Sequence, residues 1–102
     1  MASSVSEESN STKLPSELCL KHSAKLAVVD DKPVMFDYWV DSLEKKCFIG
    51  VKDGDGEKLL VKDEDQYTSP ILKIYKVNNE YLICTENSIY IVDDSVSTRR
   101  IS

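Results

Sequence analysis

The residues of this chain that could bind a metal ion gather in one acidic loop. Counted from Asp53, carboxylates stand at the first, third, fifth and twelfth positions, which are Asp53, Asp55, Glu57 and Glu64. Calcium loops use this spacing, because Ca²⁺ prefers several hard oxygen ligands. The sixth position, where the sharp turn needs glycine, is Lys58, and Asp-Gly is also the strongest short signal for a hairpin turn. We therefore predict a hairpin with no metal and no cofactor, and we keep calcium or metal binding by loop 53–64 as an alternative function.

The residues that could act as nucleophiles do not form a catalytic pattern. His22 is the only histidine, and the three cysteines, Cys19, Cys47 and Cys84, are widely spaced. The sequence has no Gly-x-Ser-x-Gly elbow and no glycine-rich loop that could hold a phosphate. Cysteines at apolar, strand-like positions are usually small core residues. We therefore expect no enzymatic activity, and a small hydrolase or metal-dependent enzyme that uses the acidic loop is the competing class.

Composition restricts the class of protein. The chain has 102 residues, of which 41% are hydrophobic and 30% are charged, and its net charge is -5. These values are typical of one soluble globular domain, and the acidic balance disfavours binding to a nucleic-acid backbone. An odd number of cysteines without a Cys-x-x-Cys pair favours a reducing intracellular compartment, cytoplasmic or nuclear. The sequence contains neither a secretory signal nor an apolar run of transmembrane length, so we expect no membrane partner.

Residues 70–93 predict a three-stranded antiparallel meander. Ile, Val, Tyr and Thr are frequent in its three apolar runs, and these residues fit a half-buried pleated surface better than a helix. Asn78-Asn79 and Glu86-Asn87 stand where two-residue hairpin loops belong, because Asn tolerates the left-handed conformation of such turns. The rest of the chain must supply the layer against which this meander packs.

The expected register places apolar side chains on both faces of the meander. With two-residue loops, Ile74 pairs with Ile83, and Ile83 pairs with Tyr90. One face then carries Leu72, Ile74, Tyr81, Ile83, Tyr90 and Val92. The other face carries Ile71, Tyr75, Leu82, Cys84, Ile89 and Ile91, interrupted by Lys73. A sheet with one wet face alternates more cleanly, so the meander is either covered on both faces or uses one face as a docking surface.

Shorter elements surround the meander. Residues 1–13 are serine-rich and polar, which predicts a disordered tail ahead of a single β domain, residues 14–102. Residues 14–24 fit either a short helix or an extended segment. Further strands are predicted at residues 26–29, 34–40, 46–51 and 59–62, with an edge strand near 96–101. Within and after 34–40 a helix competes with the strand, because Phe36, Trp39, Val40, Leu43 and Cys47 also fit helical spacing.

The segment from Lys32 to Val92 resembles small uncharacterised β-proteins of phages and large DNA viruses. The strings DYWVDSLEKKCFIGV, EDQYTSPI and TENSIYIV carry the resemblance. The resemblance implies a compact SH3-like barrel or a related small roll, and a viral accessory protein that acts on a host or viral partner. It implies no activity, so no functional residue is transferred from it.

Together these patterns predict an all-β fold, either a small antiparallel SH3-like barrel or a sandwich of six to seven strands. The expected function is a non-enzymatic protein-interaction module, whose partner is another protein or a second copy of the chain. The predicted interaction residues are Trp39, Lys76, Glu80, Tyr81 and Tyr90, because Tyr and Trp at a surface are typical interface anchors. Lys73 and Lys76 beside tyrosines leave single-stranded nucleic-acid binding as a further alternative, which the net negative charge disfavours.

Overall fold

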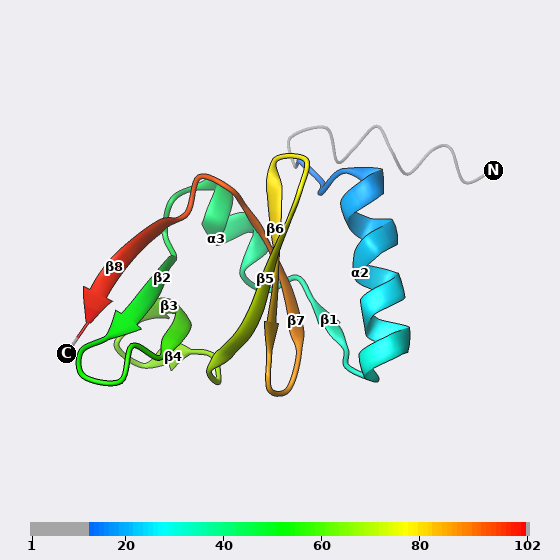
Figure 1. Ribbon diagram of the computed structural model, residues 1–102. Coiled ribbons are helices and arrows are strands. Elements are labelled where there is room, and N and C mark those ends of the chain that lie inside the picture. Colours follow the sequence, from blue (N-terminus) through cyan, green and yellow to red (C-terminus); the bar gives the residue numbers. More distant parts are fainter. Residues whose placement is uncertain (1–12, 102) are drawn as a thin grey trace.

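The computed structural model describes residues 13–101, which form two four-stranded sheets and two helices (Figure 1). In chain order the elements are α2 (Glu17–Asp30), β1 (Val34–Met35), α3 (Trp39–Leu43), β2 (Phe48–Lys52), β3 (Lys58–Asp63), β4 (Gln66–Tyr67), β5 (Ile71–Val77), β6 (Glu80–Thr85), β7 (Ile89–Asp93) and β8 (Ser97–Ile101). The first sheet has the strand order β1-β7-β6-β5, and the second has the order β4-β3-β2-β8. The segment predicted to be a disordered tail, residues 1–13, lies outside the described residues apart from Lys13.

The prediction of an all-β fold is confirmed in part: the structure is mostly β but also contains the helices α2 and α3, and the strand connectivity differs from the expected antiparallel one. β1 is parallel to β7 and β8 is parallel to β2, so both sheets are mixed. These parallel pairs arise because the chain returns to each sheet after a long crossover through the rest of the molecule. The described residues contain eight strands rather than six or seven, in two sheets that do not close into a barrel.

The predicted meander and its register are confirmed. β5, β6 and β7 are neighbours in the first sheet, Ile74 lies opposite Ile83, and Ile83 lies opposite Tyr90. Asn78 in the first turn has a φ of 53°, the left-handed conformation that favoured Asn there. Both two-residue loops are therefore present as the sequence indicates.

A bulge changes the start of β5. The register shifts between Ile71 and Lys73, which adds one residue to β5 relative to β6. As a result Ile71 packs against the same buried cluster as Ile83, and Leu72 is 58% exposed. The prediction that Ile71 shares a face with Tyr75 is wrong, because an extra residue breaks the two-residue alternation of a strand.

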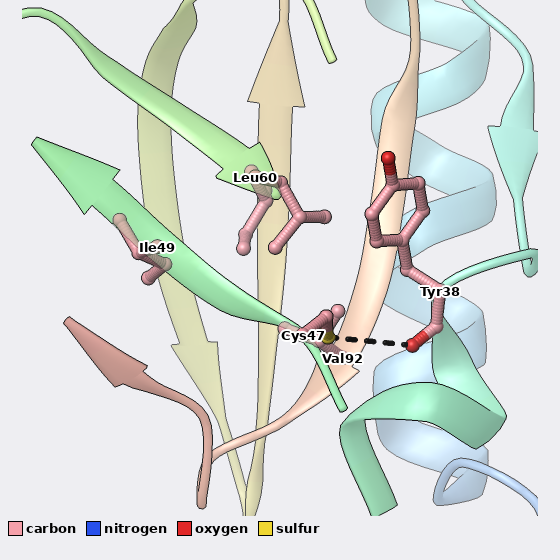
Figure 2. Close-up of a cluster of buried hydrophobic side chains, with 6 residues drawn as sticks. Tyr38, Cys47, Ile49, Leu60 and Val92 are labelled. Carbon is pink, nitrogen blue, oxygen red and sulfur yellow. Dashed lines mark hydrogen bonds between the residues drawn. The ribbon is translucent and has the colours of Figure 1, made fainter. Parts of the chain in front are cut away.

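Strands β6 and β7 of the meander are covered on both faces. The inter-sheet cluster, drawn in Figure 2, consists of Tyr38, Cys47, Ile49, Leu60, Ile83 and Val92. The helix-side cluster consists of Cys19, Trp39, Leu82 and Ile91. The two-sided hydrophobicity of β6 and β7 therefore reflects burial between the second sheet and the helices, and neither strand is left as a docking surface.

Residues 26–29 are helical, so the prediction of a strand there is wrong. They form the C-terminal part of α2, which begins after Ser16 and ends where Asp31 adopts a φ of 55°. The Ser16 side chain accepts a hydrogen bond from the Cys19 backbone N–H at 3.2 Å and so caps the first turn. Leu20 and Leu26 pack against the helix-side cluster, and this tertiary contact outweighs the strand preference of Val28 and Val29.

The predicted strand at 34–40 is confirmed only for its first two residues. Val34 and Met35 pair with β7, whereas Trp39 begins the short helix α3. The competing helical spacing is confirmed only for Trp39 and Leu43, which α3 places in and against the helix-side cluster. Phe36 and Val40 are exposed, and Cys47 lies after the helix. The strands expected at 46–51 and 59–62 correspond to β2 and β3, and the expected C-terminal edge strand is β8.

Candidate functional site

Strand β5 is the most exposed apolar element of the first sheet. It stands at the end of the order β1-β7-β6-β5, and within residues 13–101 no strand pairs with its outer edge. Leu72 is 58% exposed, Ile74 37% and Tyr75 39%. Helix α2 packs over β7, β6 and β1, so β5 lies beside the helix rather than beneath it (Figure 1). A seven-residue strand is thus open at its edge and on parts of both faces.

The pattern of hydrogen bonds indicates which backbone groups of β5 point outward. The bonds from Thr85 N–H to Ser88 O at 2.9 Å and from Asp94 N–H to Asn79 O at 3.0 Å show that odd-numbered residues of β6 bond to β7. Even-numbered residues of β6 therefore bond to β5, because antiparallel strands alternate their bonding direction. Their partners on β5 are odd-numbered. The N–H and C=O groups of Ile74 and Lys76 accordingly face the open edge.

Two surface grooves flank β5, one toward each of its ends. The first, of about 620 Å³, lies between α2 and the C-terminal part of β5, and its lining includes Leu18, Val29 and Tyr75. The second, of about 460 Å³, lies between the β2–β3 turn and the N-terminal part of β5, where Leu72 and Ile74 contribute to it. Exposed apolar side chains of β5 therefore border a recess on either side of the open edge.

The groove beside α2 is locally basic in an acidic chain. Its lining residues, all within 13–101, include His22, Lys25 and Lys76 but no carboxylate, whereas the whole chain has a net charge of -5. Lys73 is also exposed on β5. Lys76 forms an ion pair with Asp94, at 3.5 Å between Nζ and Oδ2. The lining of this groove thus contains two lysines and no carboxylate, and Asp94 compensates one of these lysines.

Of the five predicted interaction residues, Trp39 and Glu80 are buried, each 3% exposed. The Trp39 Nε1–H donates to the Lys13 carbonyl at 2.8 Å. The Glu80 carboxylate accepts a hydrogen bond from the Ser16 hydroxyl at 2.8 Å. Both side chains stabilise the junction between α2 and the meander rather than a surface.

The remaining three predicted residues lie apart from one another. Tyr81 and Tyr90 are half-buried and pack against the inter-sheet cluster. The Tyr90 ring meets the Tyr38 ring edge-on, with 5.3 Å between centroids and 81° between planes. Only Lys76 lies on the exposed strand β5.

Leu72, Ile74 and Tyr75 are the surface residues that sequence reasoning did not select. A signal for them is present in the sequence: Lys73 and Lys76 fall on opposite faces of the same predicted strand. Charges on both faces of an otherwise apolar strand are typical of an edge. The apolar neighbours of these lysines could therefore have been chosen as the exposed set.

A buried polar group lies where the β6–β7 ladder meets the start of α2. Glu80 and Asp93 are direct cross-strand neighbours, 3% and 9% exposed. Asp93 lies 3.9 Å from the Lys13 ammonium and accepts a hydrogen bond from the Ser95 N–H at 3.0 Å. Burial, followed by the charge of Glu80, raises the pKa of the nearby Cys19 thiol to about 11. A protonated thiol is a poor nucleophile at neutral pH. Cys19, Glu80 and Asp93 are therefore better explained as structural residues than as catalytic ones.

The acidic loop forms the predicted hairpin turn between β2 and β3. Asp53 lies 3.3 Å from the Arg100 Nε, and Glu57 lies 3.2 Å from the Lys52 Nζ. The Asp55 carboxylate accepts a hydrogen bond from the Glu57 N–H at 2.9 Å. Within residues 13–101, no group of three or more His, Cys, Asp or Glu side chains could hold a metal ion. Asp53, Asp55 and Glu57 thus each have a partner within or beside this turn.

A third groove, of about 790 Å³, lies on the outer face of the second sheet. Its apolar lining consists of Phe48, Leu59, Val61, Tyr67 and Ile101. Leu59 and Val61 are buried although they belong to this face, and both charge signs occur around it, through Lys52, Asp63, Glu64 and Arg100. It therefore offers fewer free apolar side chains, and a less defined charge, than the surface around β5.

Comparison with known proteins gives no match among protein-family models, curated proteins or solved structures. Within the part of the chain that the structure describes, no helix is both long and apolar enough to cross a membrane.

Proposed function

We propose that this chain is a non-enzymatic protein-interaction module and that strand β5 is its binding surface. The observation that carries the proposal is the combined exposure of the β5 edge and of Leu72, Ile74 and Tyr75 beside it. Exposed sheet edges bind extended segments through backbone hydrogen bonds, and neighbouring recesses select their side chains. The buried thiols and ion-paired carboxylates described above give no comparable support to catalysis.

Protection of the edge is the structural alternative to binding. Lysines on an edge strand discourage pairing with other chains, and Lys73 and Lys76 fit that role. The three exposed apolar side chains on the same strand do not protect the edge, because protected edges carry polar or charged residues at such positions. Their presence favours a surface that is covered by a partner.

The test is a selection of peptides against the immobilised full chain from a random twelve-residue display library. We expect the enriched peptides to bind about tenfold or more weakly to an Ile74→Pro variant, because the outward Ile74 N–H is lost while the β6 ladder is kept. An unpaired backbone partner costs about 1–3 kcal/mol, which corresponds to this loss of affinity.

Two further variants make the selection decisive. Ile74→Thr keeps the N–H and a β-branched side chain, so it should bind better than Ile74→Pro. Tyr67→Ser alters the third groove and should leave binding unchanged. If no peptide is enriched, or if enriched peptides bind Ile74→Pro as well as the original chain, the assignment of β5 is wrong. Amide NMR spectra of each variant establish that the fold is retained.

Single-stranded nucleic-acid binding is the second candidate, because Lys73, Tyr75 and Lys76 are all exposed on β5. Stacking on an aromatic ring beside cations is the usual mode of such binding, but the net charge of -5 opposes it. A gel shift with an oligothymidylate at low salt distinguishes the two, since retention that Tyr75→Ser abolishes would favour the nucleic acid.

The biological setting that fits a binding module is that of a viral accessory protein in a reducing compartment. The resemblance of residues 32–92 to small β-proteins of phages and large DNA viruses supports the first part. The three cysteines, all buried and free, support the second. The SH3-like barrel that the same resemblance implies stays a prediction.

A further inference from the structure

The two faces of β5 differ in chemistry. Tyr75 lies opposite Leu82 of the helix-side cluster, and Lys73 lies opposite Cys84. Both therefore belong to the face toward α2, where His22 and Lys25 line the first groove. Lys73 of the strand and Lys25 of the helix thus place cations on this side of the open edge.

The opposite face of β5 is more apolar. Ile74 lies opposite Ile83 of the inter-sheet cluster, and Ile74 and Leu72 both line the second groove. The charged residues around that groove are of mixed sign: Glu57, Lys58, Lys73 and Glu86. Lys76 also belongs to this face, because it lies opposite Tyr81, but its ammonium is paired with Asp94. A segment placed against β5 would meet Leu72 and Ile74 here, and Lys73 and Tyr75 on the other face.

We propose that β5 binds an extended acidic segment of another protein as an additional strand, with carboxylates toward α2 and apolar side chains on the opposite face. This inference rests on the proposed function, because it names the chemistry of the partner at the same strand. Side chains of a strand alternate between the two faces, so the partner sequence alternates acidic and apolar residues. Backbone bonds to Ile74 and Lys76 fix its position, and Lys73 and Lys25 select its charge.

A second copy of the chain is a poorer occupant of the same edge. Antiparallel pairing of β5 with itself about Ile74 would align all seven residues of each strand. However, each strand contributes Lys73 and Lys76 and no carboxylate, so the ribbon would concentrate four cations. Like charges on neighbouring strands destabilise their pairing, whereas an acidic segment compensates them.

The test uses three synthetic eight-residue peptides and the full chain. One peptide alternates Glu with Val, the second alternates Lys with Val, and the third has the composition of the first but groups its four Glu before its four Val. Binding is followed by fluorescence anisotropy and by amide NMR shifts. We expect the alternating acidic peptide to bind at least about tenfold more tightly than either control, with shifts at Ile74, Lys76 and Lys25.

Variants of the chain separate charge recognition from strand addition. Lys73→Glu should weaken the acidic peptide about tenfold and strengthen the Lys-Val peptide. Ile74→Pro should abolish binding of both. Lys46→Glu is the matched charge reversal, because Lys46 is exposed on another part of the surface and pairs with Glu44 at 3.1 Å. It should leave binding within about twofold of the unchanged chain.

Several outcomes would overturn the inference. With the peptides, these outcomes are binding of the Lys-Val peptide as tight as or tighter than that of the alternating acidic peptide, or no binding of any of the three. Binding of an oligothymidylate that Lys73→Glu weakens in the same way would favour a nucleic acid instead. A dimer that is seen by sedimentation and that Ile74→Pro dissociates would favour a second copy of the chain. If displayed peptides require Ile74 but are not acidic, the interaction module stands and only the acidic partner is wrong. If displayed peptides bind the Ile74→Pro variant as well as the original chain, both the binding surface at β5 and the acidic partner are wrong.

Discussion

The hydroxyl group of Ser16 forms hydrogen bonds to both α2 and the meander. Ser16 caps the helix by accepting from the Cys19 N–H at 3.2 Å, and it also accepts from the Asn78 amide at 3.2 Å. The same hydroxyl donates to the buried Glu80 carboxylate at 2.8 Å. The Ser16 hydroxyl thus donates one hydrogen bond and accepts two, and these bonds connect the first turn of α2 with the β5–β6 hairpin.

We expect Ser16→Ala to lower the free energy of unfolding by about 1–3 kcal/mol, because the cap is lost and Glu80 loses a donor. Urea denaturation measures the change. Ser97→Ala is the matched control, since Ser97 is exposed on β8, and its effect should stay within about 0.5 kcal/mol. Ser16→Thr keeps the hydroxyl and should recover part of the loss. Equal stability of the Ser16→Ala and Ser97→Ala variants would show that the hydroxyl does not join these elements.

At the scale of elements, Gly50 leaves room for side chains where β8 pairs with β2. A Cβ at this position would lie 2.9 Å from the Ile101 Cδ1 and 3.2 Å from the Val61 Cγ2. Gly50 is buried and lies opposite Arg99 and Leu59 in the middle of the sheet. The glycine therefore provides space for Ile101 to pack across the central strand.

We expect Gly50→Ala to destabilise the chain by about 1–2 kcal/mol, because the side chains of Ile101 and Val61 must shift to admit the new methyl group. Ile101→Val shortens the obstructing side chain, so the double variant should be more stable than the sum of the two single changes predicts. Thermal unfolding of the four proteins in this cycle measures the coupling. Strict additivity would mean that Ile101 and Gly50 do not oppose each other.

At the scale of the whole molecule, both buried clusters contain ionisable groups that are held neutral. Burial raises the pKa of Cys19 in the helix-side cluster and of Cys47 in the inter-sheet cluster, from 9.0 to about 11 in each case. Burial also raises the pKa of Cys84 and of Tyr38. Folding therefore keeps protons on groups that ionise more readily in the unfolded chain.

This difference predicts that stability falls at alkaline pH. Below pH 9 both states are protonated at the thiols and the full stability is present; between pH 9 and 11 the unfolded chain ionises first, so the free energy of unfolding decreases. Each thiol accounts for at most about 2–3 kcal/mol. Urea denaturation at pH 8, 9, 10 and 11 under reducing conditions measures the slope, and Cys47→Ala should make it shallower. A flat profile would contradict the neutral burial of the thiols.

Local patterns in the sequence were sufficient to predict the meander. Two-residue loops and alternating side chains determine which residues face each other, so the pairing of Ile74, Ile83 and Tyr90 could be derived without knowledge of the rest of the chain. The same holds for the hairpin at Asp53 and for the strands that flank it. These features depend on residues that are close together in the sequence.

The tertiary structure alone decided which surface is exposed. Trp39 is buried because one helical turn places it beneath α2, and β5 is an edge because no other strand of residues 13–101 pairs beyond it in the order β1-β7-β6-β5. Burial and edge position result from contacts between distant segments, whose cost in chain entropy is recovered only when the whole core forms. The sequence therefore determined the apolar residues of the meander, and the packing of α2 and the second sheet determined that Leu72, Ile74 and Tyr75 remain available to a partner.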